Sequence, residues 1–315
     1  MSEQIKVASF FAGIGGICYG FEQAGANVVW ANELDKYCCI TYRQNFKNTF
    51  LLEKDINLIN TNDVPDVDII CGGFPCQAFS IAGYQKGFND KRGILFFKLA
   101  EIIKSKKPKI VFLENVKNLL SHDKGKTFKK ILSILEEMGY FVKYKVLNTK
   151  DYGNIPQNRE RVYIVAFKNK KHYLTFNFPE PIKLTKKISD IIKFDKKQND
   201  LYYYSKNSRI YNELINTIKD KSVYQWRRVY CRKNKSNVCP TLTANMGTGG
   251  HNVPIIKDNF GIRKLTPNEC IAFQGFPKKF NFPSCISNGN KYKQAGNSVS
   301  VPVIKRIAKE IIKII

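Results

Sequence analysis

Near its N-terminus the chain contains Val7-Ala8-Ser9-Phe10-Phe11-Ala12-Gly13-Ile14-Gly15-Gly16. The apolar run Val7–Phe11 predicts a β-strand, and the glycine-rich loop after it opens an amphipathic helix from about Ile17 to Ala24. Glycines at such a point let the backbone approach a ligand at the end of the strand, as in nucleotide-binding folds. A tight strand–helix turn without a ligand is the alternative, because the spacing is not G-x-G-x-x-G and no Walker lysine follows.

Short apolar runs alternate with helical patterns through the first half of the chain. Strands are predicted at Val28–Ala31, Val67–Cys71, Ile110–Leu113 and Val162–Phe167, and helices at Leu95–Lys104 and Thr127–Met138. This alternation predicts parallel βαβ units in an open α/β sheet that is covered on both faces. Ligands of such sheets bind at the carboxyl ends of the strands, so the chemistry is expected there.

The regular pattern ends near residues 176–181. Between residues 183 and 258 there are 16 Lys and Arg against 6 Asp and Glu, a surplus of ten positive charges with little periodicity. We therefore expect a second, smaller and more irregular domain. Order resumes at Thr266-Pro267-Asn268-Glu269, a capping box that opens a helix. Val301–Ile315 has its apolar residues on one helical face.

Composition limits the classes of function. The 315 residues carry 52 Lys and Arg against 26 Asp and Glu, a net charge of +26, which favours a polyanionic partner and nucleic acid first. A membrane protein is disfavoured, because no apolar run approaches the ~18–20 residues of a bilayer span and the N-terminus has no apolar signal core. The nine cysteines form no Cys-x-x-Cys and only three histidines are present, which argues against a zinc framework and a disulfide scaffold. Reduced thiols in a cytoplasm are expected, most of them packing residues.

One cysteine is placed differently from the others. Gly72-Gly73-Phe74-Pro75-Cys76-Gln77 directly follows a predicted strand, so Cys76 sits at a carboxyl strand end after a rigid proline. A thiol there is positioned as a nucleophile if positive charge or helix amides stabilise its thiolate, and a structural cysteine in a turn is the alternative. Residues 78–94 follow without a helical or strand pattern and carry Lys86, Lys91 and Arg92. Loops of this length are usually functional lids, with a surface loop as the alternative.

Several acids and arginines are further candidates for the site, and two of the acids, Glu33 and Glu114, end predicted strands. Glu33 could accept hydrogen bonds from a ribose diol, and Asp55 could accept one from an adenine amino group, although both could be solvated acids. Glu114 ends a buried strand, where desolvation favours the protonated form and suits a proton donor; an N-cap is the alternative. Arg159 and Arg161 lie two apart, which predicts one strand face and an anion-binding pair, or two solvated charges.

Five motifs follow one another in a set order: Phe-Ala-Gly-x-Gly-Gly, Gly-Phe-Pro-Cys-Gln, Glu-Asn-Val, Gln-x-Arg-x-Arg and Gly-Asn-Ser-Val. In these motifs and their order the chain resembles the DNA (cytosine-5)-methyltransferase family, most of all its single-chain bacterial modification enzymes, over residues 6–182 and 263–310. The resemblance implies a Rossmann-like, S-adenosylmethionine-dependent methyltransferase domain of residues 1–182 plus 290–315. It also implies a small target-recognition domain of residues 183–289.

The resemblance further implies a role for individual residues. Cys76 would be the nucleophile, Glu114 the acid that recognises the base, and Arg159 and Arg161 the anchors of the target cytosine. S-adenosylmethionine would be held by Phe11, Gly13, Gly15, Glu33, Asp55, Ile56, Pro75, Leu95, Asn297 and Ser298. Candidate DNA-binding residues are Ser80, Lys86, Lys91, Arg92, Arg227, Arg228, Thr241 and Leu242.

The implied partners are double-stranded DNA and a cognate restriction endonuclease. The resemblance also implies a monomer in the bacterial cytoplasm, associated with the nucleoid. Neither a membrane nor a metal ion is expected as a partner. Three other classes compete with this interpretation. A tRNA cytosine methyltransferase would share the motifs, but a basic domain of roughly 100 residues favours duplex DNA. Intact Cys76, Glu114 and Arg159 argue against an inactive DNA-binding protein. The Phe-x-Gly-x-Gly-Gly spacing argues against a nicotinamide-dependent oxidoreductase.

Overall fold

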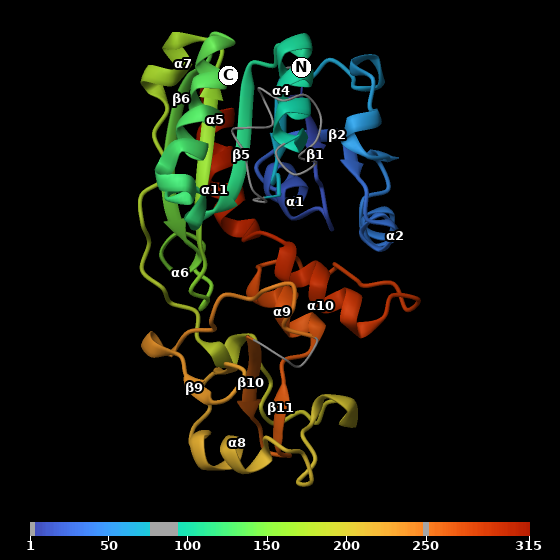
Figure 1. Ribbon diagram of the computed structural model, residues 1–315, viewed down its shortest axis with the longest axis vertical. Helices are drawn as coiled ribbons and strands as arrows, with labels where there is room; N and C mark the ends of the chain where they lie inside the picture. The colour runs from blue at the N-terminus through green and yellow to red at the C-terminus, as the bar shows by residue number, and fades with distance from the viewer. Residues whose placement is uncertain (1–3, 76–93, 248–251) are drawn as a thin grey trace. The chain divides into compact units, whose positions relative to one another are not determined.

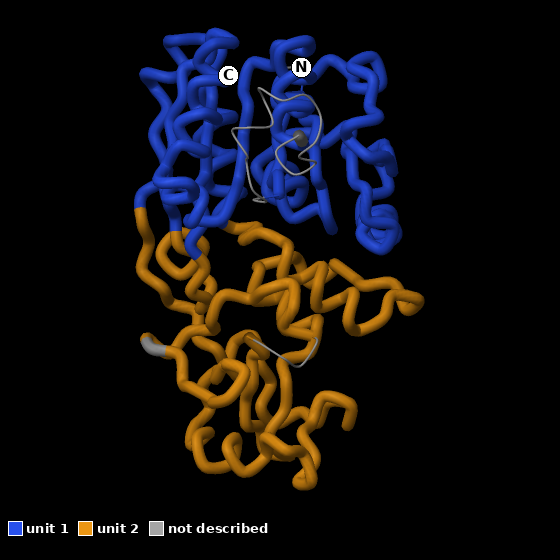
Figure 2. The backbone as a smooth tube through the Cα atoms, in the orientation of Figure 1, with its two compact units in different colours: residues 1–147, 160–180, 303–315 blue, residues 148–159, 181–302 orange. Residues whose placement is uncertain are grey.

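The computed structural model describes residues 4–75, 94–247 and 252–315. Packing divides the chain into two compact units, coloured separately in Figure 2. The first unit comprises residues 1–147, 160–180 and 303–315, and the second comprises residues 148–159 and 181–302. The domains expected from the sequence are divided differently, since they assign residues 148–159 and 290–302 to the catalytic domain.

The first unit is a sheet with helices on both faces (Figure 1). Its elements are β1 (Lys6–Phe10), α1 (Gly16–Glu22), β2 (Asn27–Glu33), α2 (Lys36–Asn45), β3 (Phe50–Glu53), β4 (Ile69–Gly72), α4 (Ile94–Lys106), β5 (Ile110–Val116), α5 (Lys126–Glu137), β6 (Phe141–Asn148), β7 (Glu160–Phe167), α7 (Lys170–Thr175) and α11 (Val301–Ile312). The strands and helices predicted for the first half all form, with ends that differ by a few residues. Four elements, α2, β3, β6 and α7, are not among the predicted ones.

The seven strands follow the order β3-β2-β1-β4-β5-β7-β6. The strands β1 to β5 are parallel, but β7 pairs antiparallel to β5. The prediction of parallel units is therefore wrong at β7. Residues 162–167 are buried throughout, and a uniformly apolar run has the same pattern whichever way its strand runs. The direction of β7 therefore cannot be read from its sequence.

Alternate residues of the strands supply two cores, one on each face of the sheet. On one face, Phe96 and Leu99 of α4 and Ile131 of α5 join buried residues of β1, β4, β5 and β7 in one cluster. On the other face, the ring of Phe21 in α1 packs edge-on against Phe112 of β5, with 5.3 Å between centroids. α1 and α11 approach so closely there that a Cβ on Gly20 would lie 2.3 Å from Ile304.

The second unit contains more regular structure than the sequence indicates. Its elements are α6 (Thr149–Tyr152), α8 (Tyr211–Thr217), β8 (Tyr224–Trp226), β9 (Cys231–Lys233), β10 (Val253–Lys257), β11 (Ile262–Lys264), α9 (Pro267–Phe273) and α10 (Asn288–Asn297). The strands form an antiparallel sheet in the order β11-β10-β8-β9. Leu214 of α8 and Ile218, directly after α8, pack into the core of this sheet. The predicted capping box of α9 is confirmed, because Thr266 and Glu269 exchange side-chain-to-backbone hydrogen bonds.

A buried ion cluster joins β11 to α9. Arg263 is 0% exposed and donates both terminal nitrogens to Glu269, at 2.8 Å each, and Nε to Asp258 at 2.6 Å. Tyr203 donates a further hydrogen bond to Asp258. A buried guanidinium is tolerated only when its donors are satisfied, so these contacts hold the β10–β11 turn and α9 in one arrangement.

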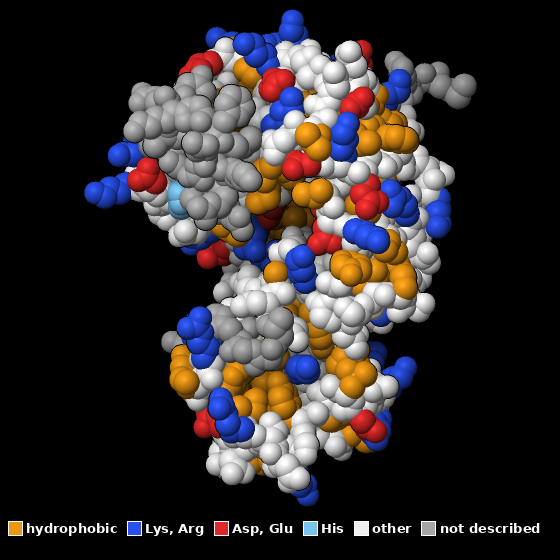
Figure 3. All heavy atoms as spheres, turned by 45° about the vertical axis from the view of Figure 1, so that its right-hand side comes forward, with side chains coloured by type: hydrophobic (Ala, Val, Ile, Leu, Met, Phe, Trp, Pro, Cys, Tyr) orange, Lys and Arg blue, Asp and Glu red, His pale blue; other side chains and the backbone are white. Residues whose placement is uncertain are grey.

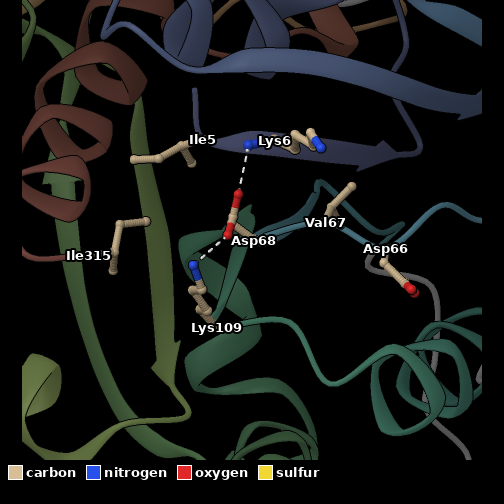
Figure 4. Close-up of a pocket in the computed structure, with 7 residues that line it drawn as sticks. All are labelled: Ile5, Lys6, Asp66, Val67, Asp68, Lys109 and Ile315. Carbon is tan, nitrogen blue, oxygen red and sulfur yellow. Dashed lines mark hydrogen bonds and ion pairs between the residues drawn. The ribbon is translucent and has the colours of Figure 1, made fainter. Parts of the chain in front are cut away.

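At the amino ends of β1, β4 and β5, one carboxylate connects the three strands (Figure 4). Asp68 accepts the backbone N–H of Lys6 at 2.9 Å and pairs with the ammonium of Lys109 at 2.7 Å. Burial alone would raise the pKa of Asp68, but the hydrogen bonds and charges of Lys109 and Lys6 lower it overall. The ionised form of Asp68 therefore stabilises this edge of the sheet.

We predict that Asp68→Asn lowers the free energy of unfolding at pH 7 by about 1 kcal/mol. A carboxyl whose pKa is lower in the folded state contributes stability above its unfolded pKa, near 3.9, and loses it as the pH falls. The difference in Tm between wild type and variant should therefore shrink between pH 7 and pH 3. Asp66→Asn is the matched control, since that carboxylate is 92% exposed. A difference that stays constant down to pH 3 would contradict the assignment.

Candidate active site

The loop after β1 is held by the carboxylate that ends β2. Glu33 accepts the N–H of Gly13 on Oε2 and the N–H groups of Leu34 and Asp35 on Oε1, all at 2.8 Å. Three charge-assisted hydrogen bonds to backbone give this carboxylate a structural role that the sequence did not indicate. The loop and the end of β2 are therefore one rigid piece.

Glycine is required in this loop for two different reasons. Gly13 and Gly15 have φ values of +56° and +85°, a region that favours glycine. A Cβ on Gly15 would lie 2.1 Å from the ring of Phe46, so the protein itself closes that side. A Cβ on Gly13 would meet no atom within 4 Å. The Gly13 side of the loop thus has room for a ligand.

The other predicted cofactor residues of the first unit lie along the same edge of the sheet. Because β3, β2, β1 and β4 are parallel neighbours, their carboxyl ends bring together Phe11, Glu33, Asp55, Ile56 and Pro75. Asp55 caps the turn after β3 by accepting the N–H of Asn57 at 2.9 Å, and Ile56 is buried. Leu95, in the first turn of α4, packs against the core.

Asn297 and Ser298 belong to the second unit, at the carboxyl end of α10. Asn297 is exposed, whereas Ser298 is buried and its carbonyl accepts a hydrogen bond from Arg159. Their predicted contact with the cofactor stays a prediction.

Glu114 forms a nearly buried ion pair at the end of β5. Its Oε1 lies 3.2 Å from Nε of Arg161, and the two side chains are only 9% and 13% exposed. Burial disfavours the charged carboxylate, whereas the adjacent guanidinium stabilises it. The predicted preference for the protonated form thus omitted the partner, which arrives on the neighbouring strand β7.

The loop after β4 is fastened to the end of β5. Asn115 donates Nδ2–H to the carbonyl of Phe74 at 2.9 Å, and both groups are buried. A Cβ on Gly73 would lie 3.2 Å from Oε2 of Glu114, so glycine lets the loop backbone approach the carboxylate. Asn115 is a positioning residue that the sequence analysis did not single out, although it is the centre of the Glu-Asn-Val motif.

Five predicted residues lie outside the described residues: Cys76, Ser80, Lys86, Lys91 and Arg92. Most other cysteines are buried, as expected for packing residues, but Cys285 is exposed and Cys38 is half-buried. The prediction that most thiols are packing residues therefore does not extend to Cys285, which lies in the loop before α10. Burial raises the pKa of Cys18 to about 11 and that of Cys39 to about 12, so both are protonated near neutral pH.

Arg159 is not on a strand face with Arg161, and that prediction is wrong. β7 begins at Glu160, and the backbone of Arg159 bonds instead with Asn148 and Thr149 of the second unit. Arg159 is 2% exposed, and its guanidinium donates to the carbonyls of Leu242 (2.8 Å), Gly296 (3.2 Å) and Ser298. The spacing of two residues would place both arginines on one face only if both were in the strand, and only Arg161 is.

Thr241 and Leu242 also belong to the group of segments that Arg159 connects. Thr241 donates its hydroxyl to the carbonyl of Asn158 at 2.6 Å, and the side chain of Leu242 is 1% exposed. A Cβ on Gly296 would lie 2.2 Å from the backbone of Thr243, so α10 packs directly on this segment. Direct DNA contact by Thr241 and Leu242 stays a prediction, and their observed contacts are with the protein.

Arg227 and Arg228 lie in the turn between β8 and β9. The N–H of Arg227 donates to the carbonyl of Tyr230, and its guanidinium reaches Asn252 at 2.9 Å. Arg228 is exposed with a positive φ of 71°. Val229 is 80% exposed and Tyr230 47% exposed, so the tip of the hairpin combines basic and apolar side chains. This combination is typical of a surface that contacts nucleic acid.

Within the part of the chain that the structure describes, no helix has both the length and the hydrophobicity of a membrane span. The same residues contain no group of three or more His, Cys, Asp and Glu arranged to hold a metal ion.

Residues 5–313 match the model of the family described as C-5 cytosine-specific DNA methylase. The chain belongs to this family. It is 56% identical to Type II methyltransferase M.Bsp6I of Bacillus sp. (strain RFL6), over 98% of this chain and 99% of the relative. It is 40% identical to Type II methyltransferase M.HhaI of Haemophilus parahaemolyticus, over 98% and 94%. The protein is thus a type II DNA (cytosine-5)-methyltransferase of the restriction–modification class, which uses S-adenosylmethionine.

Solved structures show the same fold. A Spodoptera frugiperda DNMT2 mutant superposes with a TM-score of 0.79 at 20% identity, over 98% of this chain and 100% of that chain. At this identity the likeness shows the shared fold, a methyltransferase sheet together with a small antiparallel sheet. The fold class expected from the sequence is confirmed.

We predict that Arg159→Ala lowers the free energy of unfolding by about 3 kcal/mol. The substitution leaves three carbonyls of the second unit without their shared donor, and each unsatisfied buried group costs about 1–3 kcal/mol before relaxation. Urea unfolding monitored by circular dichroism measures the change. Arg228→Ala, which removes an exposed arginine, should change it by less than about 0.5 kcal/mol. Equal effects of the two substitutions would show that Arg159 does not hold these segments together.

Proposed function

We propose that Cys76 is the nucleophile of the methyl transfer and that Glu114 recognises the target cytosine. The observation that carries this proposal is the joined end of β4 and β5. Arg161 engages Oε1 of Glu114, and Oε2 lies beside Gly73. Cys76 follows Gly73 by three residues, which span at most about 11 Å. The chain length therefore allows the Cys76 thiolate to approach a base held by Glu114.

The proposed chemistry begins with the low nucleophilicity of C5 in cytosine. The Cys76 thiolate attacks C6, and a proton from Glu114 to N3 takes up the charge, which makes C5 an enamine carbon. The carboxylate of Glu114 also accepts the exocyclic amino group. After C5 has gained its methyl group, loss of the C5 proton to a base expels the Cys76 thiolate. Since a stacked base cannot meet the thiol, the cytosine must be flipped out of the duplex.

S-adenosylmethionine supplies the methyl group as an electrophilic sulfonium substituent. The free side of Gly13 and the carboxylates at the ends of β2 and β3 fit such a ligand, because they offer space, a left-handed loop and hydrogen-bond acceptors. We assign the contacts of the first unit to Phe11, Gly13, Gly15, Glu33, Asp55, Ile56, Pro75 and Leu95. Asn297 and Ser298 complete the proposed set from the second unit.

For residues 183–289 we propose target recognition in double-stranded DNA, with Arg227 and Arg228 as contacts. The surplus of ten charges in residues 183–258 and the mixed tip of the β8–β9 hairpin support this proposal. Figure 3 shows Lys and Arg side chains on the visible face of both units. We further propose that Ser80, Lys86, Lys91 and Arg92 contact DNA beside the flipped base.

We also propose the cellular setting. The protein would act as a monomer in the bacterial cytoplasm on nucleoid DNA. It would methylate the sites that a cognate restriction endonuclease cleaves.

DNA with 5-fluorocytosine at the target should form a stable covalent adduct with Cys76 in the presence of cofactor. Fluorine cannot leave C5 as the proton does, so the thiolate is not expelled after methyl transfer. The adduct is measured by denaturing gel and located by peptide mass spectrometry. We expect none with Cys76→Ala, and we expect Cys285→Ala, which removes an exposed thiol, to trap as wild type does. An adduct on any other cysteine would refute the assignment.

DNA affinity should fall steeply with salt, and replacing both Arg227 and Arg228 by Ala should flatten that dependence. The slope of log K against log [salt] changes by about 0.9 for each phosphate that the protein no longer neutralises, so two phosphates predict a change of about 1.8. A base-reading role predicts instead that discrimination between cognate and non-cognate duplexes declines at fixed salt. Arg209→Ala with Lys206→Ala is the control of equal charge. If slope and discrimination are both unchanged, the hairpin tip does not contact DNA.

A further inference from the structure

The second unit contains a depression of about 400 Å³, and no residue of the hairpin tip lines it. Its walls come from residues 191–202, from the start of α9 and from the start of α10. Polar side chains dominate this lining, among them Lys193, Lys196, Lys291, Tyr202, Asn268 and Asn288. These residues belong neither to the hairpin tip nor to the proposed active site.

The three lysines of this basic pocket are not neutralised by ion pairs. Among the described residues, Lys193, Lys196 and Lys291 have no carboxylate within 4.0 Å, although Lys197 in the same segment pairs with Asp200 at 2.9 Å. Three ammonium groups around one concavity give it a positive potential, which favours an anion there.

The carboxylate in the pocket wall does not supply that compensation. Both oxygens of Glu269 are engaged by Arg263, and one also accepts the N–H of Thr266. With Asp258, the buried cluster has two negative charges and one positive, a net charge of −1. The three lysines add a charge of +3, so the pocket and the buried cluster together have a net charge of +2. This positive charge is complementary to a strongly anionic group.

We propose that this basic pocket binds a phosphate group of duplex DNA. An ammonium group acts as a point charge and can bind a phosphate from many directions. Arginine binds a carboxylate through a planar, two-point contact instead. DNA is the substrate, so it offers phosphates at high local density. The pocket thus adds an anchor that is separate from base recognition by residues 227–230.

The test compares the salt dependence of DNA binding in two triple variants. Lys193→Ala, Lys196→Ala and Lys291→Ala together remove the pocket lysines, and Lys206→Ala, Lys278→Ala and Lys279→Ala remove three exposed lysines elsewhere in the same unit. The pocket variant should flatten the slope of log K against log [salt] by about 0.9 for each phosphate held, and the control variant should flatten it by less. Thermal unfolding establishes that both variants are folded.

Further measurements separate the sources of phosphate and the two functions. Methylation at saturating DNA should be unchanged in the pocket variant, because Cys76 and Glu114 are intact; a loss of turnover there would overturn a pure anchoring role.

Calorimetry with inorganic phosphate and with adenosine monophosphate provides the other comparison. Millimolar-or-tighter binding of either by wild type, with no difference in DNA slope, would assign the pocket to a small anion and overturn the DNA proposal. Equal slopes for both triple variants would also overturn it, since charge alone would then explain the effect.

Discussion

The guanidinium of Arg159 is the contact on which the second unit depends. It binds carbonyls from the Thr241-Leu242 segment and from the end of α10, and it is almost fully buried. Two residues later, Arg161 pairs with Glu114 in the first unit. The Gln-x-Arg-x-Arg motif therefore supplies a scaffold contact to one unit and a site contact to the other. This division explains why two arginines so close in sequence differ so much in surroundings.

Much of the first unit was predictable because its local patterns have one physical solution. Apolar runs followed by glycine-rich turns predicted two strand ends, and the structure ends β1 at Phe10 and β4 at Gly72. Strand direction was not predictable, since the buried run of β7 is the same in either sense. The small sheet was not predicted because β8, β9 and β11 are only three residues long. Three residues are too few to show the alternation of apolar and polar side chains that identifies a strand.

Side-chain partners were less predictable than positions in the fold. Glu33 was expected to face a ribose, but three backbone N–H groups already occupy most of its acceptor sites. Arg159 was expected to face an anion, and it faces carbonyls. In both cases the residue type indicated a need for hydrogen bonds, and at least one partner came from a segment distant in sequence, Gly13 for Glu33 and Leu242 for Arg159. Only the Thr266–Glu269 capping box, whose partners are local, was predicted with its contacts.

In the reaction that we propose, Glu114 donates a proton to N3 of cytosine and accepts a hydrogen bond from the exocyclic amino group, so its protonation state matters. Burial favours the neutral form of this carboxyl group, and the pair with Arg161 favours the charged form. The two effects therefore act in opposite directions on one side chain, and both depend on β5 and β7 being neighbouring strands.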